Sequence, residues 1–276
     1  MTSTLSKYTS LWPRLIAALA GGLTILFATL WNQWGYFAIF LFISIMSQYE
    51  FYRLARLDDK FPLKTWGTII GQLFFVLSFL VEADIIHLKY FLLIFPMLAS
   101  VFLIQLYKRN GEKPFTHVAF TYLGVIYVAI PFALLNIIAF SSGEYSYEPV
   151  LGILFILWAS DTGAYFAGIT FGKKKLFERI SPKKTWEGSI GGGIAAMILA
   201  FAVGHYFQSV PQWQWYVIAG IIVIAGTYGD LVESLFKRSI EIKDSGTFIP
   251  GHGGFLDRFD GLLLATPFIV AFIKIF

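Results

Sequence analysis

The stretch HVAFTYLGVIYVAIPFALLNIIAF, residues 117–140, is one continuous apolar run without the alternation of apolar and polar residues that a half-exposed strand would have. A helix needs about 20 mostly apolar residues to cross a bilayer. A membrane-spanning strand would alternate in polarity, because one of its faces meets lipid and the other meets the barrel interior. This stretch therefore predicts a transmembrane α-helix.

Runs of the same character recur along the whole chain. Hydrophobic residues make up 57% of the sequence and charged residues 14%, whereas a typical soluble domain has about 25% charged residues. We count nine runs, of which the second, third and last are short, and they predict an all-α, polytopic integral membrane helix bundle with about nine transmembrane helices. The runs cover residues 12–31, 34–50, 66–82, 89–107, 117–140, 150–171, 189–208, 213–236 and 261–276.

Basic residues are distributed unequally between the connections. With nine spans, 19 of the 21 Lys and Arg residues would lie on one side of the bilayer, and only Lys89 and Lys274 on the other. The positive-inside rule makes the basic side cytoplasmic. We therefore predict that the N-terminus is cytoplasmic.

Polar residues inside the apolar runs are the first candidates for a functional site, because a charge in the hydrocarbon core costs about 2.5–3.5 kcal/mol on insertion scales. Asp161 is one such residue, and a structural carboxylate bonded to a neighbouring helix is its alternative interpretation. Asp230, Ser234, Lys237 and Arg238 follow helical spacing. They predict one polar stripe that leads to the cytoplasmic end of a helix.

The most polar segment is KDSGTFIPGHGGFLDRFDG, residues 243–261, which lies between two apolar runs. Asp257 and Asp260 share a face if this turn is helical, and two close carboxylates repel each other unless a cation relieves the repulsion. Mg²⁺ usually takes one or two carboxylates together with substrate phosphates. Asp230 with Asp257 is our first choice of ligand pair, and Asp260 and Asp161 are alternatives.

Glycines of the same segment favour an anion-binding loop. Gly251, Gly253 and Gly254 allow backbone conformations that are closed to other residues, and their amides can converge on an anion. A plain turn is the alternative interpretation. His252 would either bond a phosphate or hold the turn in place.

The remaining polar residues, and the residue types that are missing, limit the kinds of reaction that the site could perform. Lys183 and Lys184, in the basic stretch SPKK, would clamp a triphosphate or a lipid phosphate. The absence of Cys excludes disulfides, iron–sulfur clusters and thiolate metal sites, and the four His residues lack zinc-ligand spacing. No Ser-His-Asp grouping is recognisable. Carboxylates, basic side chains and a glycine-rich loop at the end of a helix bundle favour phosphoryl or nucleotidyl transfer to a lipid.

The segment from Ser234 to Asp260, SLFKRSIEIKDSGTFIPGHGGFLDRFD, resembles the signature of the phosphatidate cytidylyltransferases, or CDP-diacylglycerol synthases. That signature reads S-x-apolar-K-R, four residues, K-D, and a Pro/Gly turn into H-G-G-x-x-D-R-x-D, and every fixed position is present. The stretches WASDTGAYFAG and SPKKTWEG are also similar to family features. The resemblance is strong over about residues 150–276, whereas the N-terminal half matches only in having several apolar spans.

The resemblance implies a reaction of CTP with phosphatidic acid that yields CDP-diacylglycerol and pyrophosphate. It implies Mg²⁺ as cofactor and leaves a second, monovalent cation open. It also implies a homodimer among membrane lipids, in a bacterial inner (plasma) membrane, with the active site facing the cytoplasm. We expect no nucleic acid partner. Residues 1–149 would supply about five spans, and residues 150–276 would form the catalytic region with its polar cytoplasmic loops.

The pattern and the resemblance together assign roles to individual residues. Asp230 and Asp257 are the predicted metal ligands. The predicted catalytic residues are Asp230, Asp257, Lys237, Arg258 and Asp260. The predicted substrate-binding residues are Lys183, Lys184, Ser234, Arg238, Lys243, Asp244, Gly251, His252, Gly253, Gly254 and Asp161.

Two other functions stay open at this point. A transporter would use Asp161 and Asp230 as an intramembrane carboxylate site for cation or proton coupling, but the chain has no convincing internal repeat of the kind that transporters carry. A CTP-dependent polyprenol kinase or an archaeol-type cytidylyltransferase would keep the class of enzyme and change the lipid acceptor.

Overall fold

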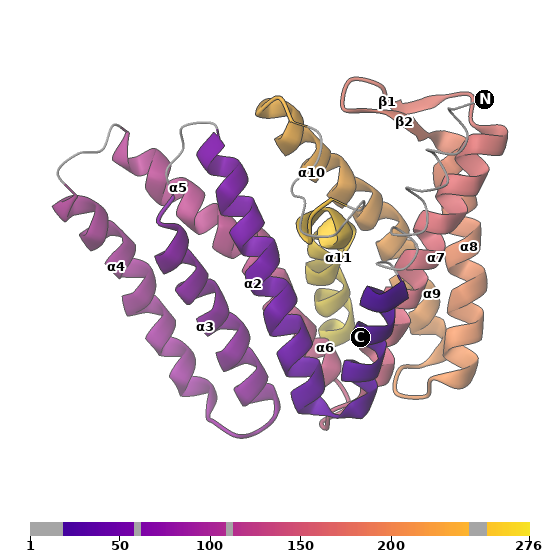
Figure 1. Ribbon diagram of the computed structural model, residues 1–276. Helices are drawn as coiled ribbons and strands as arrows, with labels where there is room; N and C mark the ends of the chain where they lie inside the picture. Colours follow the sequence, from indigo (N-terminus) through magenta and orange to yellow (C-terminus); the bar gives the residue numbers. More distant parts are fainter. Residues whose placement is uncertain (1–18, 58–61, 109–112, 243–252) are drawn as a thin grey trace.

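The computed structural model describes residues 19–57, 62–108, 113–242 and 253–276, and within these ranges the chain is almost entirely helical (Figure 1). Several helices join end to end, so that they form single rods. The elements are a helical stretch Leu19–Trp31, α2 (Gln33–Leu57), α3 (Lys64–Glu82), η1 (Leu88–Leu93), α4 (Ile94–Tyr107), α5 (Pro114–Gly124), η2 (Val125–Ala129), α6 (Ile130–Ala139), α7 (Tyr147–Phe171), β1 (Lys175–Phe177), β2 (Ser181–Thr185), α8 (Trp186–Tyr206), α9 (Gln212–Ile221), η3 (Ile222–Gly226), α10 (Thr227–Ser239) and α11 (Leu256–Ile275).

Counting each continuous rod once, the described part of the chain has nine helices, one for each predicted span. Six of them are long and apolar enough to cross a membrane. The other three are the short stretch Leu19–Trp31 and the helices α2 and α11, which carry charged residues. The expected short second and last spans are longer than their apolar runs, at 25 and 20 residues. The all-α membrane bundle is confirmed.

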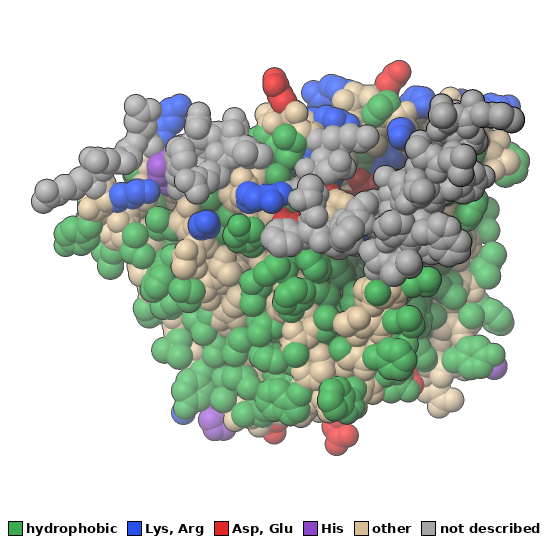
Figure 2. All heavy atoms as spheres, viewed as in Figure 1, with side chains coloured by type: hydrophobic (Ala, Val, Ile, Leu, Met, Phe, Trp, Pro, Cys, Tyr) green, Lys and Arg blue, Asp and Glu red, His purple; other side chains and the backbone are tan. Residues whose placement is uncertain are grey.

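The surface has the polarity that a bilayer requires. Figure 2 shows a broad band of apolar side chains around the middle of the molecule, with charged side chains at its two ends. Large apolar residues such as Phe102, Phe166 and Phe201 are exposed, whereas a soluble protein rarely exposes so large an apolar surface. The band therefore faces lipid, and the protein is an integral membrane protein.

Helix α11 lies between the two sides of the bundle. In Figure 1, α2, α3 and α4 stand on one side and α7, α8 and α9 on the other, with α10 and α11 between them. Helix α11 packs against α6, α10, η3 and α2. Its first turn is therefore held by elements from both halves of the sequence.

Polar groups inside the bundle bond to one another, because hydrocarbon offers no water to satisfy them. The fully buried Gln48 donates from Nε2 to the Gly67 carbonyl oxygen at 2.9 Å. The Tyr52 hydroxyl donates to the Thr121 carbonyl oxygen at 2.7 Å. These bonds fasten α2 to α3 and α5, and they involve no charged group.

Helices α7 and α8 approach closely through small residues. A Cβ atom placed on Gly192 would lie 2.7 Å from the Ser160 carbonyl oxygen, and one on Gly163 would lie 2.6 Å from the Ala195 Cβ. Small residues at such contacts let backbones meet, which is how helices associate when lipid supplies no hydrophobic driving force. This contact positions Asp161, one residue after Ser160, beside the loop that precedes α8.

That loop contains the one pair of strands in the described part of the chain. Strands β1 and β2 are antiparallel, with Lys175 opposite Thr185 and Phe177 opposite Ser181. The Thr185 side chain caps α8 by accepting from the Gly188 amide at 3.1 Å. The sequence predicted only a basic loop here, and short local pairing became possible because this segment lies beyond the apolar band.

The close α7–α8 contact leads to a stability prediction. Gly192→Ala should lower the free energy of unfolding by about 1–3 kcal/mol, because its methyl group meets backbone atoms that cannot move aside. The measurement is thermal or denaturant unfolding in detergent.

Gly193→Ala is the matched control, since a Cβ there meets no atom closer than 3.7 Å. Replacing Gly by Ala inside a helix stabilises both variants by the same amount, about 0.8–1.0 kcal/mol in water. The difference between the two variants therefore measures packing alone. Equal stability of the two variants would contradict the packing argument.

Candidate active site

Charged side chains from α7, β2, α10 and α11 gather at one end of the bundle. This is the end at which α10 finishes and the β1–β2 hairpin lies (Figure 1). Most Lys and Arg side chains visible in Figure 2 also lie at this end. We describe it from α10 outward, since α10 carries the predicted polar stripe.

Asp230 is held on both carboxylate oxygens. The Ser234 hydroxyl donates to its Oδ1 at 3.2 Å, as the spacing of four residues predicted. The Lys184 ammonium lies 2.6 Å from its Oδ2 and also donates to the Thr227 carbonyl oxygen at 3.4 Å. The hairpin therefore serves to bring Lys184 from β2 onto the stripe of α10.

Lys237 joins α10 to α11. Its ammonium forms ion pairs with Glu233, one turn earlier on the same helix, and with Asp257 Oδ1 on α11 at 2.7 Å. The Glu233 side chain is only 1% exposed and that of Lys237 only 12%. Removal of one partner from a buried ion pair is strongly destabilising, because the other charge is left uncompensated. The two helices are therefore fastened at the site itself.

The first turn of α11 begins on a glycine turn. Asp257 Oδ2 accepts a hydrogen bond from the Gly254 amide at 2.8 Å, which places a carboxylate at a helix N-terminus where the backbone dipoles favour it. Gly253 has φ +80°, and a Cβ on it would lie 2.3 Å from Asp257 Oδ2. Glycine is required at position 253 for both reasons.

Asp161, Asp230 and Asp260 form what we call the acidic cluster. Asp161 and Asp260 each lie within electrostatic range of Asp230 and of Lys184, and Asp260 is also within range of Asp161. Arg258 acts on Asp161 as a second cation. Asp260 Oδ1 accepts from the Gly261 amide at 2.7 Å. Three carboxyl groups thus lie near two basic side chains, and their oxygens are donors that a hard cation would bind.

The donor set fits Mg²⁺ when substrate completes the coordination. Among the described residues, no three carboxylate or imidazole side chains converge closely enough to hold a metal ion alone. All the acidic donors are hard oxygen ligands, and Mg²⁺ commonly binds one or two of these with substrate phosphates and water. The first-choice pair Asp230 and Asp257 stays a prediction. In the structure Asp230 lies within electrostatic range of the alternatives Asp161 and Asp260, whereas Asp257 is bonded to Lys237 and to the Gly254 amide.

The predicted site residues fall into three groups. The first group makes the ion pairs and hydrogen bonds described above: Lys184, Asp230, Ser234, Lys237 and Asp257. Close to them in electrostatic range lie Asp161, Arg258 and Asp260. The adjoining turn is formed by Gly253 and Gly254. Lys183 and Arg238 are exposed at the same end and form no ion pair with a described residue. The predicted positions Lys243, Asp244, Gly251 and His252 lie outside the described residues.

Two residues near the site were absent from the sequence prediction. Glu233 is the buried partner of Lys237, and its i, i+4 spacing to that lysine was a readable signal. Tyr127 lies on η2, and its buried hydroxyl has no hydrogen-bond partner in the described structure. The Tyr127 ring packs at a tilt against Phe51, and its hydroxyl lies within electrostatic range of Asp260, Glu233 and Asp230. With aromatic residues at 18% of the chain, no sequence signal singled out Tyr127.

The two turns of π-helix occur in rods that border the site. Helix η2 ends two residues before Pro131, whose ring would collide with the carbonyl of Tyr127 in a regular α-helix. Helix η3 ends four residues before Asp230. Such single-turn insertions are frequent at functional sites; here η2 contains Tyr127, and η3 leads into α10, which carries Asp230 and Lys237.

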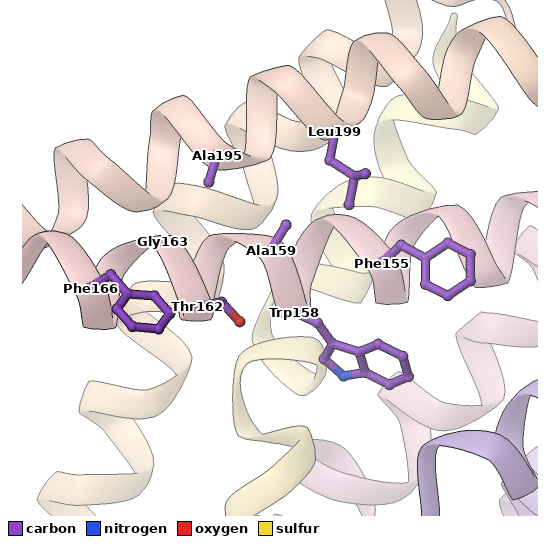
Figure 3. Close-up of a pocket in the computed structure, with 8 residues that line it drawn as sticks. All are labelled: Phe155, Trp158, Ala159, Thr162, Gly163, Phe166, Ala195 and Leu199. Carbon is purple, nitrogen blue, oxygen red and sulfur yellow. The ribbon is translucent and has the colours of Figure 1, made fainter. Parts of the chain in front are cut away.

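An apolar groove of about 560 Å³ lies on the lipid-facing side, between α7 and α8. Figure 3 shows Phe155, Trp158 and Phe166 along α7, and Ala195 and Leu199 above them on α8. Its described lining has no charged side chain. The groove is therefore separate from the charged site in chemistry, although Asp161 and Thr162 are consecutive residues of α7.

Comparison with known proteins agrees with this arrangement. A phosphatidate cytidylyltransferase from Haemophilus influenzae is 42% identical over 159 residues, which is 51% of this chain and 55% of that protein. The enzyme of the same name from Bacillus subtilis is 37% identical over 182 residues, 65% of this chain and 67% of that protein. One from Staphylococcus saprophyticus is 35% identical over 176 residues, 63% and 66% respectively. The matched stretches thus span 55% to 67% of the length of these relatives.

A family model extends the likeness to almost the whole chain. The model described as the cytidylyltransferase family matches residues 12–276, which include every described helix. The resemblance inferred from the signature between Ser234 and Asp260 is confirmed at the level of the family. With its charged site at the end of an apolar helix bundle, this chain belongs to the cytidylyltransferase family.

Proposed function

We propose that this protein transfers CMP from CTP to phosphatidic acid, giving CDP-diacylglycerol and pyrophosphate. One observation carries the proposal: Lys184, Lys237 and Arg258 gather with carboxylates where an apolar helix bundle ends. A lipid phosphate and a water-soluble nucleotide can meet only at such a boundary. Family membership and the names of the relatives support the same reaction.

The reaction needs charge management more than proton transfer. A phosphate oxygen of phosphatidic acid forms a bond to the α-phosphorus of CTP, and the bond from that phosphorus to the bridging oxygen breaks, so that pyrophosphate leaves. The attacking phosphomonoester is largely ionised near neutral pH, since its second pKa is about 6. Two anions must therefore be brought together, and electrostatic stabilisation is the main task of the protein.

The contacts of each basic residue indicate which negative charges it would stabilise. Lys184, which pairs with Asp230, and Arg258, which acts on Asp161, lie beside the acidic cluster and would attract phosphates that enter there. Lys183 and Arg238, both exposed at the same end, are suited to the outer phosphates of CTP. Lys237 already bridges Glu233 and Asp257, so its main contribution is to hold Asp257 in place.

Mg²⁺ would be held by Asp230 with Asp257, or by Asp230 with Asp161 or Asp260, together with phosphate oxygens. When bound there, it would neutralise triphosphate charge and polarise the α-phosphate. A second, monovalent cation and a homodimer remain expectations from the resemblance.

We further propose that the site faces the cytoplasm of a bacterium. The basic connections, including the β1–β2 hairpin, lie at the site end, which the positive-inside rule makes cytoplasmic. Single-cysteine labelling tests this cleanly because the chain has no Cys. In intact cells a membrane-impermeant maleimide should label Glu144→Cys, at the opposite end, and should leave Lys175→Cys unlabelled until the membrane is permeabilised. The reverse pattern would contradict the proposed orientation.

The direct test of the reaction is an assay of purified protein with radiolabelled CTP and phosphatidic acid. We expect a CMP-lipid and released pyrophosphate, both dependent on Mg²⁺ and abolished by EDTA. Product analysis separates the competing functions: a phosphorylated lipid with released CDP would indicate a kinase. Ion flux in proteoliposomes without nucleotide, together with no CMP transfer, would indicate a transporter.

The acidic residues give a prediction about individual side chains. Asp230→Asn and Asp257→Asn should each lower the rate of CMP transfer by about 10²-fold or more, as expected when a partner of transition-state charge is lost. Initial rates at saturating CTP and phosphatidic acid are the measurement. Retention of more than about a tenth of the wild-type rate in both variants would remove these residues from the metal-binding role.

Asp84→Asn is the control for these variants. Asp84 lies between α3 and η1, at the opposite end of the bundle, and has φ +56°. Asn tolerates this left-handed conformation nearly as well as Asp. The control should keep both the rate and the stability of the wild-type protein.

A further inference from the structure

Glu50 of α2 reaches the beginning of α11 although the two segments are 206 residues apart. Its Oε2 accepts a hydrogen bond from the Leu256 amide at 2.9 Å. Glu50 and Leu256 are both 0% exposed. A buried carboxylate from the N-terminal half therefore caps the helix that carries Asp257 and Asp260.

The start of α11 needs this partner because it has no cap of its own. Phe255 occupies the N-cap position and offers no side-chain acceptor. The first amides of a helix have no intrahelical partner, and a buried amide left unpaired costs about 1–3 kcal/mol. A Ser, Asp or Asn at position 255 would solve this locally and more simply. The chain instead uses an anion from another helix, which also sets where α11 begins relative to α2.

The charges around Glu50 are arranged to keep it buried. Burial itself disfavours its negative form, whereas the Leu256 amide, the helix dipole and Arg53, one turn further along α2, favour that form. Asp257 is the opposing charge near it, and Lys237 already holds that carboxylate. A buried carboxylate with this many compensating groups is costly to assemble, which argues for a role beyond general stability.

The turn that Glu50 caps is the one on which the site depends. Asp257, Arg258 and Asp260 all lie in the first five residues of α11. The position of this turn is set by Lys237 from α10, by the Gly254 amide and by Glu50. Glu50 is the only one of these three that comes from the N-terminal half of the sequence.

We propose that Glu50 is a positioning residue for the transfer reaction: it fixes the first turn of α11 so that Asp257 and Asp260 are held in the geometry that substrate and metal require. This rests on the proposed function. This proposal gives residues 1–149 a direct role in forming the active site, in addition to their role as membrane-spanning helices. A displacement of catalytic groups by about 1 Å can cost about 10²-fold in rate.

The test compares three substitutions at position 50 in the full-length protein. Glu50→Leu removes the acceptor, Glu50→Asp keeps the charge but is one methylene short, and Glu50→Gln keeps one acceptor oxygen at nearly the same place. Hydrogen exchange of the peptide 254–262 measures whether the turn is held, without any substrate. The kcat and the KM for CTP measure the effect on the reaction, and thermal unfolding measures general stability.

We expect Glu50→Leu to speed exchange of the 256 amide and to lower kcat, each by about 10-fold or more, with a smaller change in KM. The exchange rate and the kcat of Glu50→Asp should lie between those of Glu50→Leu and wild type. This variant replaces Glu50→Leu in the test if Glu50→Leu does not insert into the membrane. Glu50→Gln should restore protection and most of the rate. Rescue by this uncharged variant is what a hydrogen-bonded anchor predicts.

Gln48→Leu is the matched control. Gln48 is equally buried and lies two residues away, but it bonds to α3 and to Tyr52 rather than to α11. It should lower the unfolding temperature and leave the exchange of 254–262 and kcat within about twofold of wild type, because its contacts do not reach the site.

Three outcomes would overturn the positioning role. These are an unchanged kcat in both Glu50→Leu and Glu50→Asp, faster exchange without loss of rate, or an equal loss of kcat in Gln48→Leu. A wild-type protein without CMP transfer would overturn the proposed function alone, because the exchange measurements judge the anchor without substrate.

Discussion

Hydrocarbon offers no hydrogen bonds, and this constraint governs the whole molecule. A chain that is 57% hydrophobic enters the bilayer as helices because only there are all backbone groups satisfied within a span. The few polar side chains inside the bundle then bond to one another or to backbone carbonyls, as Gln48 and Tyr52 do. Apart from Asp161, which lies within α7, the charged groups of the site gather toward one end of the bundle.

The same constraint explains why the site doubles as a structural joint. A charge at the edge of the membrane must be paired, and the available partners are on other helices. Lys237 meets Asp257 across α10 and α11, and Lys184 meets Asp230 across the hairpin and α10. Each ion pair that satisfies a charge therefore also fastens two elements together. Some of the side chains that serve the proposed reaction therefore also hold the helices together.

The site also joins the two halves of the sequence. The signature segment lies entirely in the C-terminal half, yet Glu50 caps the helix that completes it, and the Tyr127 hydroxyl lies within electrostatic range of its acidic side chains. Glu50 comes from the polar end of one N-terminal span, and Tyr127 comes from the middle of an apolar one. In a helix bundle, a central helix such as α11 contacts elements from both sides, so an active site on it is rarely built from one half of the chain.

The sequence by itself determined the class of fold, the number of helices in the described chain, and the family, because continuous apolar runs and a dense polar signature are local features. It also determined that Asp230 and Ser234 would meet, since helical spacing brings residues four apart together. It could not determine the pairing of Lys237 with Asp257, the reach of Lys184 from a hairpin, or the Glu50 cap on α11. Those contacts depend on how helices pack, and packing is decided by close approaches such as Gly192 against the Ser160 carbonyl. Such complementarity of shape depends on the surfaces of two packed helices together, so it cannot be inferred from the sequence of one span.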